Sequence, residues 1–151
     1  MINRLIDVFR SFQKHNVQYL VIGGIAAVLY GVPRATFNLD ILIEASNENA
    51  RRLLDALLDA GLGTALLTNK DEILANEITI FKDRVRIDVQ TKTPGLIFED
   101  AWKRKQIMNY QGQEFYVACV EDLVASKKAA GRTIDLEDVR LLELPDKRNK
   151  V

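Results

Sequence analysis

Hydrophobic residues recur along the chain at two spacings, one typical of helices and the other of strands. In residues 2–14 they lie three and four positions apart, which predicts an amphipathic helix that ends near His15. Residues 17–22 (VQYLVI) are apolar and partly β-branched, and they run directly into Gly23 and Gly24. This pattern predicts a buried strand, a tight turn and then a short helix (IAAVLY).

Apolar and polar residues alternate through residues 37–43 (FNLDILI), as in a strand with one buried face. The apolar set, which begins with Phe37, is predicted to face the core, so Asn38 and Asp40 share the opposite face. Two later runs, EITIFK and VRIDVQT, are separated by a turn-like Asp-Arg pair and predict a β-hairpin. Asp88 is predicted to lie on the polar face of the second strand of that hairpin.

The remaining patterns predict further helices and one more hairpin. A leucine-rich helix is predicted to begin at a cap formed by Ser46 or Asn47, and the last helix at Asp135 as its N-cap residue. Together these elements predict a mixed α/β protein of the α+β class, with a mixed sheet flanked by helices. We expect a single domain over residues 1–151, in which residues 144–151 form a frayed tail.

Composition narrows the classes of function. The 151 residues include 21 Lys and Arg and 21 Asp and Glu, so no overall positive charge is available to hold a long polyanion. Nucleic acid is therefore a possible partner that the charge does not imply, and a purely nucleic-acid-binding domain is the weakest interpretation. One cysteine and one histidine leave no zinc-binding cluster and no internal disulfide. Without a signal-peptide or membrane-spanning pattern, we expect a cytoplasmic protein with no membrane partner.

The polar faces of two predicted strands carry candidate chemistry. Asp40 and Asp88 each interrupt an otherwise apolar strand, and a buried carboxylate needs water, a partner or a metal ion. If the strands are neighbours, the two carboxylates could bind Mg²⁺, while the turn at Gly23 and Gly24 could receive a phosphate. The alternative is that both carboxylates are structural and form salt bridges, for example with Arg86 or with an arginine before the strand.

Three segments together resemble the nucleotidyltransferase superfamily. VIGGIAAVLYGVPRATFNLDILIE is similar to the signature in which a Gly-Gly turn and a short helix precede R-x-T-x-D-x-D, and RVRIDVQ is similar to the strand that supplies the third carboxylate. VEDLVASKKAAGRTIDLEDVRLLE resembles D-L-x-x-x-K-x-x-A-G-R-x-x-D, a C-terminal segment of the bacterial subgroup that includes abortive-infection and toxin–antitoxin nucleotidyltransferases. The resemblance covers roughly residues 15–143.

The resemblance implies a role for each matching residue. Catalysis and metal binding fall to Asp40 and Asp88, while Asn38 occupies the first carboxylate position and brings no negative charge. The resemblance also implies nucleotide-binding residues, of which some lie beside the phosphates and others add positive charge. They are Gly23, Gly24, Arg34, Thr36, Lys127, Lys128 and Arg132.

The implied reaction is transfer of a nucleoside monophosphate from an NTP, with ATP expected, to an acceptor hydroxyl with the help of Mg²⁺ or Mn²⁺. The acceptor is left open between a protein, an RNA and a small molecule. Because Asn38 weakens a two-metal site, transfer is expected to be impaired. The alternative is a catalytically degenerate module that binds nucleotide or a partner protein, such as a toxin–antitoxin component.

Overall fold

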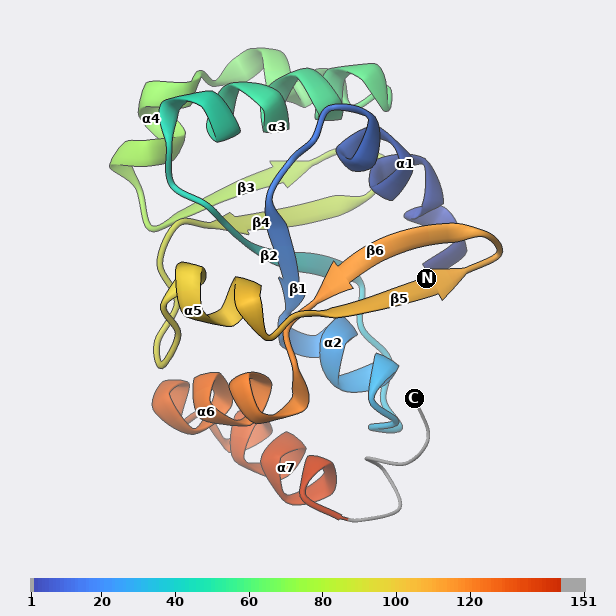
Figure 1. The fold of residues 1–151 in the computed structure, drawn as a ribbon, viewed down its shortest axis with the longest axis vertical. Helices are drawn as coiled ribbons and strands as arrows, with labels where there is room; N and C mark the ends of the chain where they lie inside the picture. The colour runs from blue at the N-terminus through green and yellow to red at the C-terminus, as the bar shows by residue number, and fades with distance from the viewer. Residues whose placement is uncertain (1, 145–151) are drawn as a thin grey trace.

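The computed structural model describes residues 2–144. Its centre is a six-stranded mixed sheet with the strand order β3-β4-β2-β1-β6-β5 (Figure 1). β2 runs parallel to β4 and antiparallel to β1, β1 runs parallel to β6, and the two outer pairs are antiparallel hairpins. The strands are β1 (Tyr19–Ile22), β2 (Asn38–Ile43), β3 (Ile78–Lys82), β4 (Arg86–Gln90), β5 (Gln106–Tyr110) and β6 (Gln113–Val117).

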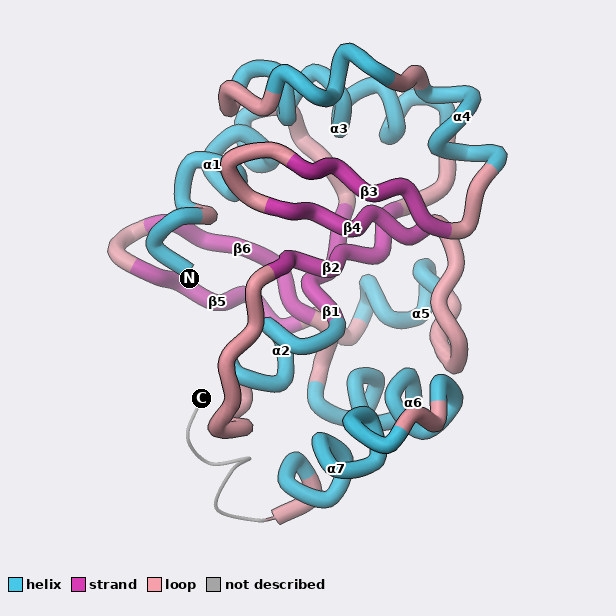
Figure 2. Tube along the Cα trace, turned by 180° about the vertical axis from the view of Figure 1, so that it is seen from behind, coloured by secondary structure: helices cyan, strands magenta, loops and turns pink. Residues whose placement is uncertain are grey.

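Helices lie on both sides of this sheet. α1, α3 and α4 lie on one side, while α5, α6 and α7 lie on the other (Figures 1 and 2). The helical segments are η1 (Ile2–Arg4), α1 (Ile6–Lys14), α2 (Gly23–Leu29), α3 (Asn47–Asp59), η2 (Gly63–Leu67), α4 (Lys70–Ala75), α5 (Phe98–Lys103), α6 (Val120–Ala130) and α7 (Thr133–Leu142). The predicted α+β class is therefore confirmed.

Apolar and polar residues alternate in β2, and the apolar ones face the core. Leu39, Ile41 and Ile43 are fully buried in the core, as predicted. Phe37 was predicted to join them, and this is wrong, because its surface is 80% exposed. The strand begins only at Asn38, which pairs with Arg86, so Phe37 lies in the preceding loop, where the alternation does not apply.

Two predicted helix starts also differ from the structure. The predicted helix over residues 2–14 is divided at Leu5 into η1 and α1. Asp135 is not the N-cap residue of the last helix. Arg132 is, and Asp135 is the third helical residue, whose carboxylate accepts from the backbone N–H of Arg132 in a capping box. By contrast, Ser46 caps α3 as predicted, because its hydroxyl accepts from the backbone N–H of Asn49.

The segment between α3 and β3 forms η2 and α4, for which no element was predicted. Across residues 2–144, no helix combines the length and apolar character needed to span a bilayer.

Candidate functional site

The two candidate carboxylates occupy directly paired positions on neighbouring strands. Asp40 of β2 pairs with Asp88 of the parallel strand β4, and two residues earlier Asn38 pairs with Arg86. Paired residues of adjacent strands point to the same face of a sheet, so all four side chains gather on one face. They line a cleft of about 460 Å³, which Gly23 also lines. The structure thus brings together the residues that the alternation placed on the polar face.

Polar contacts within the chain already satisfy part of this group. The Asn38 amide nitrogen donates to Oδ1 of Asp40 at 3.2 Å and to Oδ2 of Asp88 at 3.4 Å. Arg86 donates through Nε to Oδ1 of Asp88 at 2.9 Å and through Nη2 to Oδ2 at 3.1 Å. The salt bridge considered from the sequence therefore exists between Arg86 and Asp88, while Asp40 has no such partner among the residues described.

Asp40 is the more perturbed of the two carboxylates. Burial is the first cause that raises its pKa, and the negative charge of Asp88 is the second; together they bring the pKa to about 6. The hydrogen bond from Asn38 acts in the opposite direction but does not compensate. Asp40 is thus partly buried beside another negative charge and has no ion pair with a cation among the described residues.

Gly23 and Gly24 allow the chain to approach these side chains closely. Gly23 has φ +69°, and a Cβ atom there would lie 3.0 Å from Cβ of Asp40 and overlap its carboxylate. A Cβ atom on Gly24 would lie 2.8 Å from Nη2 of Arg34 and 3.0 Å from Oγ1 of Thr36. The predicted tight turn is wrong, because both glycines belong to the first turn of α2. Glycine is required there for a compact cleft floor in which Asp40, Arg34 and Thr36 all meet the start of this helix.

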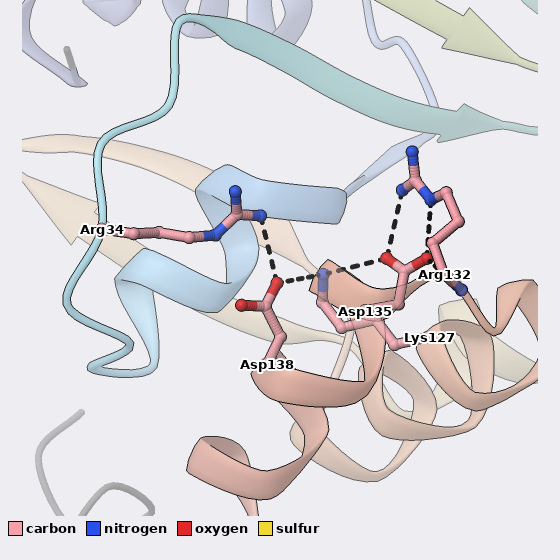
Figure 3. Close-up of polar contacts among 5 residues, drawn as sticks. All are labelled: Arg34, Lys127, Arg132, Asp135 and Asp138. Carbon is pink, nitrogen blue, oxygen red and sulfur yellow. Dashed lines mark hydrogen bonds and ion pairs between the residues drawn. The ribbon is translucent and has the colours of Figure 1, made fainter.

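A row of alternating charges runs beside the same cleft, and all of its members except Asp138 line it (Figure 3). Asp138 accepts from Arg34 at 3.0 Å and from Lys127 at 2.8 Å, and Arg132 pairs with Asp135 at 2.7 Å. Nζ of Lys127 lies 4.0 Å from Asp135 and so connects the two acids. The row joins the loop before β2 to α6 and α7, and it contains three cations and two carboxylates.

The members of this row differ in exposure. The side chains of Lys127 and Asp138 are 4% and 2% exposed, whereas those of Arg34 and Arg132 are 27% and 74% exposed. The guanidinium groups are thus the ends that solvent or a ligand can reach. Nε of Arg34 is buried and has no hydrogen-bond partner within the described residues, so one donor there is unsatisfied.

Lys128 is the one predicted nucleotide-binding residue that the structure places elsewhere. It is absent from the cleft lining, and its Nζ pairs with Glu143 at 3.1 Å with the side chain 58% exposed. Lys127 and Lys128 are consecutive residues of a helix, so their side chains point in different directions, and only Lys127 is turned toward the cleft.

The donors in the cleft suit one hard cation better than two. Within residues 2–144, no three His, Cys, Asp or Glu side chains gather in a way that could hold a metal ion. The cleft offers the oxygens of two carboxylates and of one amide, all of which are ligands that Mg²⁺ accepts. Gly23 leaves the Asp40 carboxylate without a covering side chain, and burial together with the charge of Asp88 raises the pKa of Asp40. These residues fit a single Mg²⁺ ion.

Sequence comparison identifies the family of the chain. The family model described as "Nucleotidyltransferase of unknown function (DUF6036)" matches residues 3–148. The chain belongs to this nucleotidyltransferase family. Among curated proteins, none is similar enough in sequence to be matched with it.

Solved structures agree with this nucleotidyltransferase assignment at the level of the fold. A candidate nucleotidyltransferase from Thermotoga maritima is similar with a TM-score of 0.59 and 15% identity, over 93% of this chain and 90% of that one. An antigenic nucleotidyltransferase-like protein from Paracoccidioides brasiliensis gives a TM-score of 0.56 and 15% identity, over 93% of this chain and 73% of that one.

Sequence reasoning assigned no role beside this cleft to Asp138. A signal for it exists, because Asp138 lies four residues before the buried Leu142 and is therefore on the face of α7 that packs inward. A carboxylate on such a face requires buried partners. Which cations would supply them depends on the tertiary structure alone.

Proposed function

We propose that the cleft binds an NTP together with Mg²⁺ or Mn²⁺ and transfers its nucleoside monophosphate to an acceptor hydroxyl, with pyrophosphate as the leaving group. ATP is the expected nucleotide. The observation that carries this proposal is the direct pairing of Asp40 with Asp88 in a cleft that cations also line, in a chain of a nucleotidyltransferase family.

In this proposal the carboxylates of Asp40 and Asp88 and the amide oxygen of Asn38 would hold the metal. When bound, Mg²⁺ neutralises phosphate charge and favours attack at phosphorus. Asn38 would turn its amide to present oxygen instead of the nitrogen that now donates to both acids. Because Asn38 adds no charge, we expect weaker metal binding and slower transfer than a site with three carboxylates would give.

The phosphates would lie between the start of α2 and the row of charges. Arg34 and Arg132 would donate to phosphate oxygens, since both are accessible from the cleft. Gly23, Gly24 and Thr36 would line the approach of the phosphates, and Lys127 would add its charge from within that row. Lys128 has no part in the proposal because it does not line the cleft.

The acceptor hydroxyl would approach Asp88, which would orient it or take its proton as phosphorus is attacked. That role requires Asp88 to be released from Arg86, which now donates to both of its oxygens. Protein, RNA and small-molecule acceptors all remain compatible with this arrangement.

One observation favours a second function without transfer. Asn38 and Arg86 both donate to the carboxylates, so part of the negative charge of the site is already compensated within the chain without any ion. In that case the protein would act as a nucleotide-binding or protein-interaction module, for instance as a toxin–antitoxin component.

The test is incubation of the purified protein with each labelled NTP, Mg²⁺ or Mn²⁺ and lysate, in parallel with calorimetry of MgATP binding. Wild type should bind MgATP and transfer label to an acceptor. Asp40→Asn should bind MgATP more weakly and transfer less label. Lys128→Gln serves as the matched control, because it removes a nearby cation that lies outside the cleft. Binding without transfer supports the nucleotide-binding module. No binding by wild type contradicts both the transferase and the nucleotide-binding module, and it favours the protein-interaction module.

A further inference from the structure

We infer that Arg86 is the resident counter-cation of the carboxylate pair, that it competes with a divalent metal ion for Asp88, and that it thereby sets the metal affinity of the cleft. This inference rests on the proposed function, because it concerns the same site. It assigns to Arg86 a role that neither the motif nor the fold predicts.

The geometry of the contact supports competition rather than simple proximity. The guanidinium of Arg86 engages both oxygens of Asp88, at 2.9 and 3.1 Å, in a two-pronged arrangement. Oδ2 of Asp88 also accepts from Asn38 at 3.4 Å. Paired, bidentate contacts of this kind are strong and directional. A metal ion that takes Asp88 as a ligand therefore competes with Arg86 for the lone pairs and the negative charge of the same two oxygens.

The two partners differ in their freedom to move. The side chain of Asp88 is 12% exposed and is fixed between β2 and β3, both of which pair with its strand. The side chain of Arg86 is 44% exposed, and it is long enough to adopt other rotamers without a change in the backbone. Exchange of the partner at Asp88 is thus achieved by movement of Arg86 alone.

The displaced guanidinium would remain beside the ligand, because Arg86 lines the cleft. If a metal ion bound alone, Arg86 would lose its contact with Asp88 and gain no new acceptor. If a metal ion bound together with a triphosphate, Arg86 would lose the same contact but could donate to the phosphate oxygens instead. The arrangement therefore disfavours free metal and favours the metal–nucleotide complex.

Binding of Mn²⁺ alone, measured by calorimetry, tests this inference. We expect Arg86→Gln to bind Mn²⁺ at least about tenfold more tightly than wild type, which corresponds to about 1.4 kcal/mol. Arg86→Lys should be intermediate, because an ammonium group cannot engage two oxygens as a planar fork does. Lys82→Gln is the matched control, since Lys82 is exposed and sits directly opposite Arg86 on β3.

Thermal melting supplies a second readout from the same four proteins. Without metal, Arg86→Gln should melt at a lower temperature than wild type, because Asp88 loses its counter-charge beside Asp40. Mn²⁺ should reverse that loss, and the increase in melting temperature should exceed the increase for wild type and for Lys82→Gln. A purely structural arginine would show the loss without recovery, and that result would overturn the inference.

The outcomes separate this inference from the proposed function. Equal gains in Mn²⁺ affinity for Arg86→Gln and Lys82→Gln would mean that removal of any nearby positive charge has the same effect. An unchanged Mn²⁺ affinity in Arg86→Gln would mean that Arg86 does not compete with the metal ion. Either result overturns the role of Arg86 and leaves the proposed function in place. If no variant binds Mn²⁺, including Asn38→Asp combined with Arg86→Gln, both the inference and the metal-dependent function fail.

Discussion

Oδ2 of Asp138 accepts a hydrogen bond from Nη2 of Arg34 at 3.0 Å, across 104 residues of the chain. The same oxygen accepts from Lys127 at 2.8 Å, in surroundings that leave Asp138 only 2% exposed. One carboxylate thus holds two cations of the cleft in place.

Asp138→Asn should therefore lower the free energy of unfolding by about 3–5 kcal/mol, as expected when one partner of a buried ion pair loses its charge. The substitution is nearly isosteric, so packing is preserved and the loss reports charge. Urea denaturation measures it. Glu137→Gln, on the exposed neighbouring position that pairs with Arg140, should leave the midpoint almost unchanged. Equal effects of the two substitutions would contradict a special role for Asp138.

Asn38→Asp should make the cleft more dependent on metal. A third carboxylate beside Asp40 and Asp88 increases repulsion, so the variant should melt below wild type in the presence of a chelator. Added Mg²⁺ or Mn²⁺ should raise its melting temperature more than that of wild type, because an ion that binds only the folded state stabilises it. Nucleotide transfer should appear or increase. Identical metal responses of the two proteins would show that position 38 is not a ligand position.

The raised pKa of Asp40 predicts a pH-dependent stability. Because the folded-state pKa is about 6 and the ordinary value is 3.8, ionised Asp40 destabilises the fold above about pH 6. The penalty is relieved as the pH falls from about 6 toward 4, where the folded state binds the proton more tightly. Asp40→Asn should thus be more stable than wild type at neutral pH in a chelator, and the difference should vanish near pH 4. A difference that stays constant over this range would exclude Asp40 as its source.

Gly23→Ala should be more damaging than an alanine at another glycine with positive φ. Gly23 has φ +69° and no room beside Asp40, whereas Gly61 has φ +86° and no heavy atom within 4 Å of the place that a Cβ atom would take. Gly61→Ala should cost about 1–2 kcal/mol for the backbone conformation alone. Gly23→Ala should cost more in urea denaturation and should also weaken the melting response to Mn²⁺. If the two variants lose the same stability and keep the same response, the contact with Asp40 is unimportant.

The sequence predicted the local part of this site and not its long-range part. The two-residue period of β2 and β4 was enough to place Asn38, Asp40 and Asp88 on polar faces, because alternation is a property of each strand. The direct pairing of Asp40 with Asp88 depends on strand order and register, which no single strand encodes. The resemblance to nucleotidyltransferases supplied the expectation that both carboxylates belong to one metal site.

Boundaries and distant partners were the parts that the sequence could not supply. Alternation alone gave no sign that β2 would begin after Phe37, because that depends on where the neighbouring strand stops pairing. The same holds for Arg132, which became the N-cap residue although arginine is not a preferred one, since Asp135 binds both its backbone and its side chain. Such choices follow from contacts that form only in the folded protein.

The order of the elements along the chain has a consequence for synthesis. β2 and β4, with their carboxylates, leave the ribosome before α6, α7 and the N-cap residue of α7, which supply Lys127, Asp138 and Arg132. A nascent chain that ends before α6 therefore has the acidic half of the cleft and lacks most of the row of charges beside it. Arg34 has at that stage no carboxylate of α7 to hold it. The triphosphate binding that we propose should thus arise late in translation, when the last two helices dock, and unfinished chains should not sequester nucleotide.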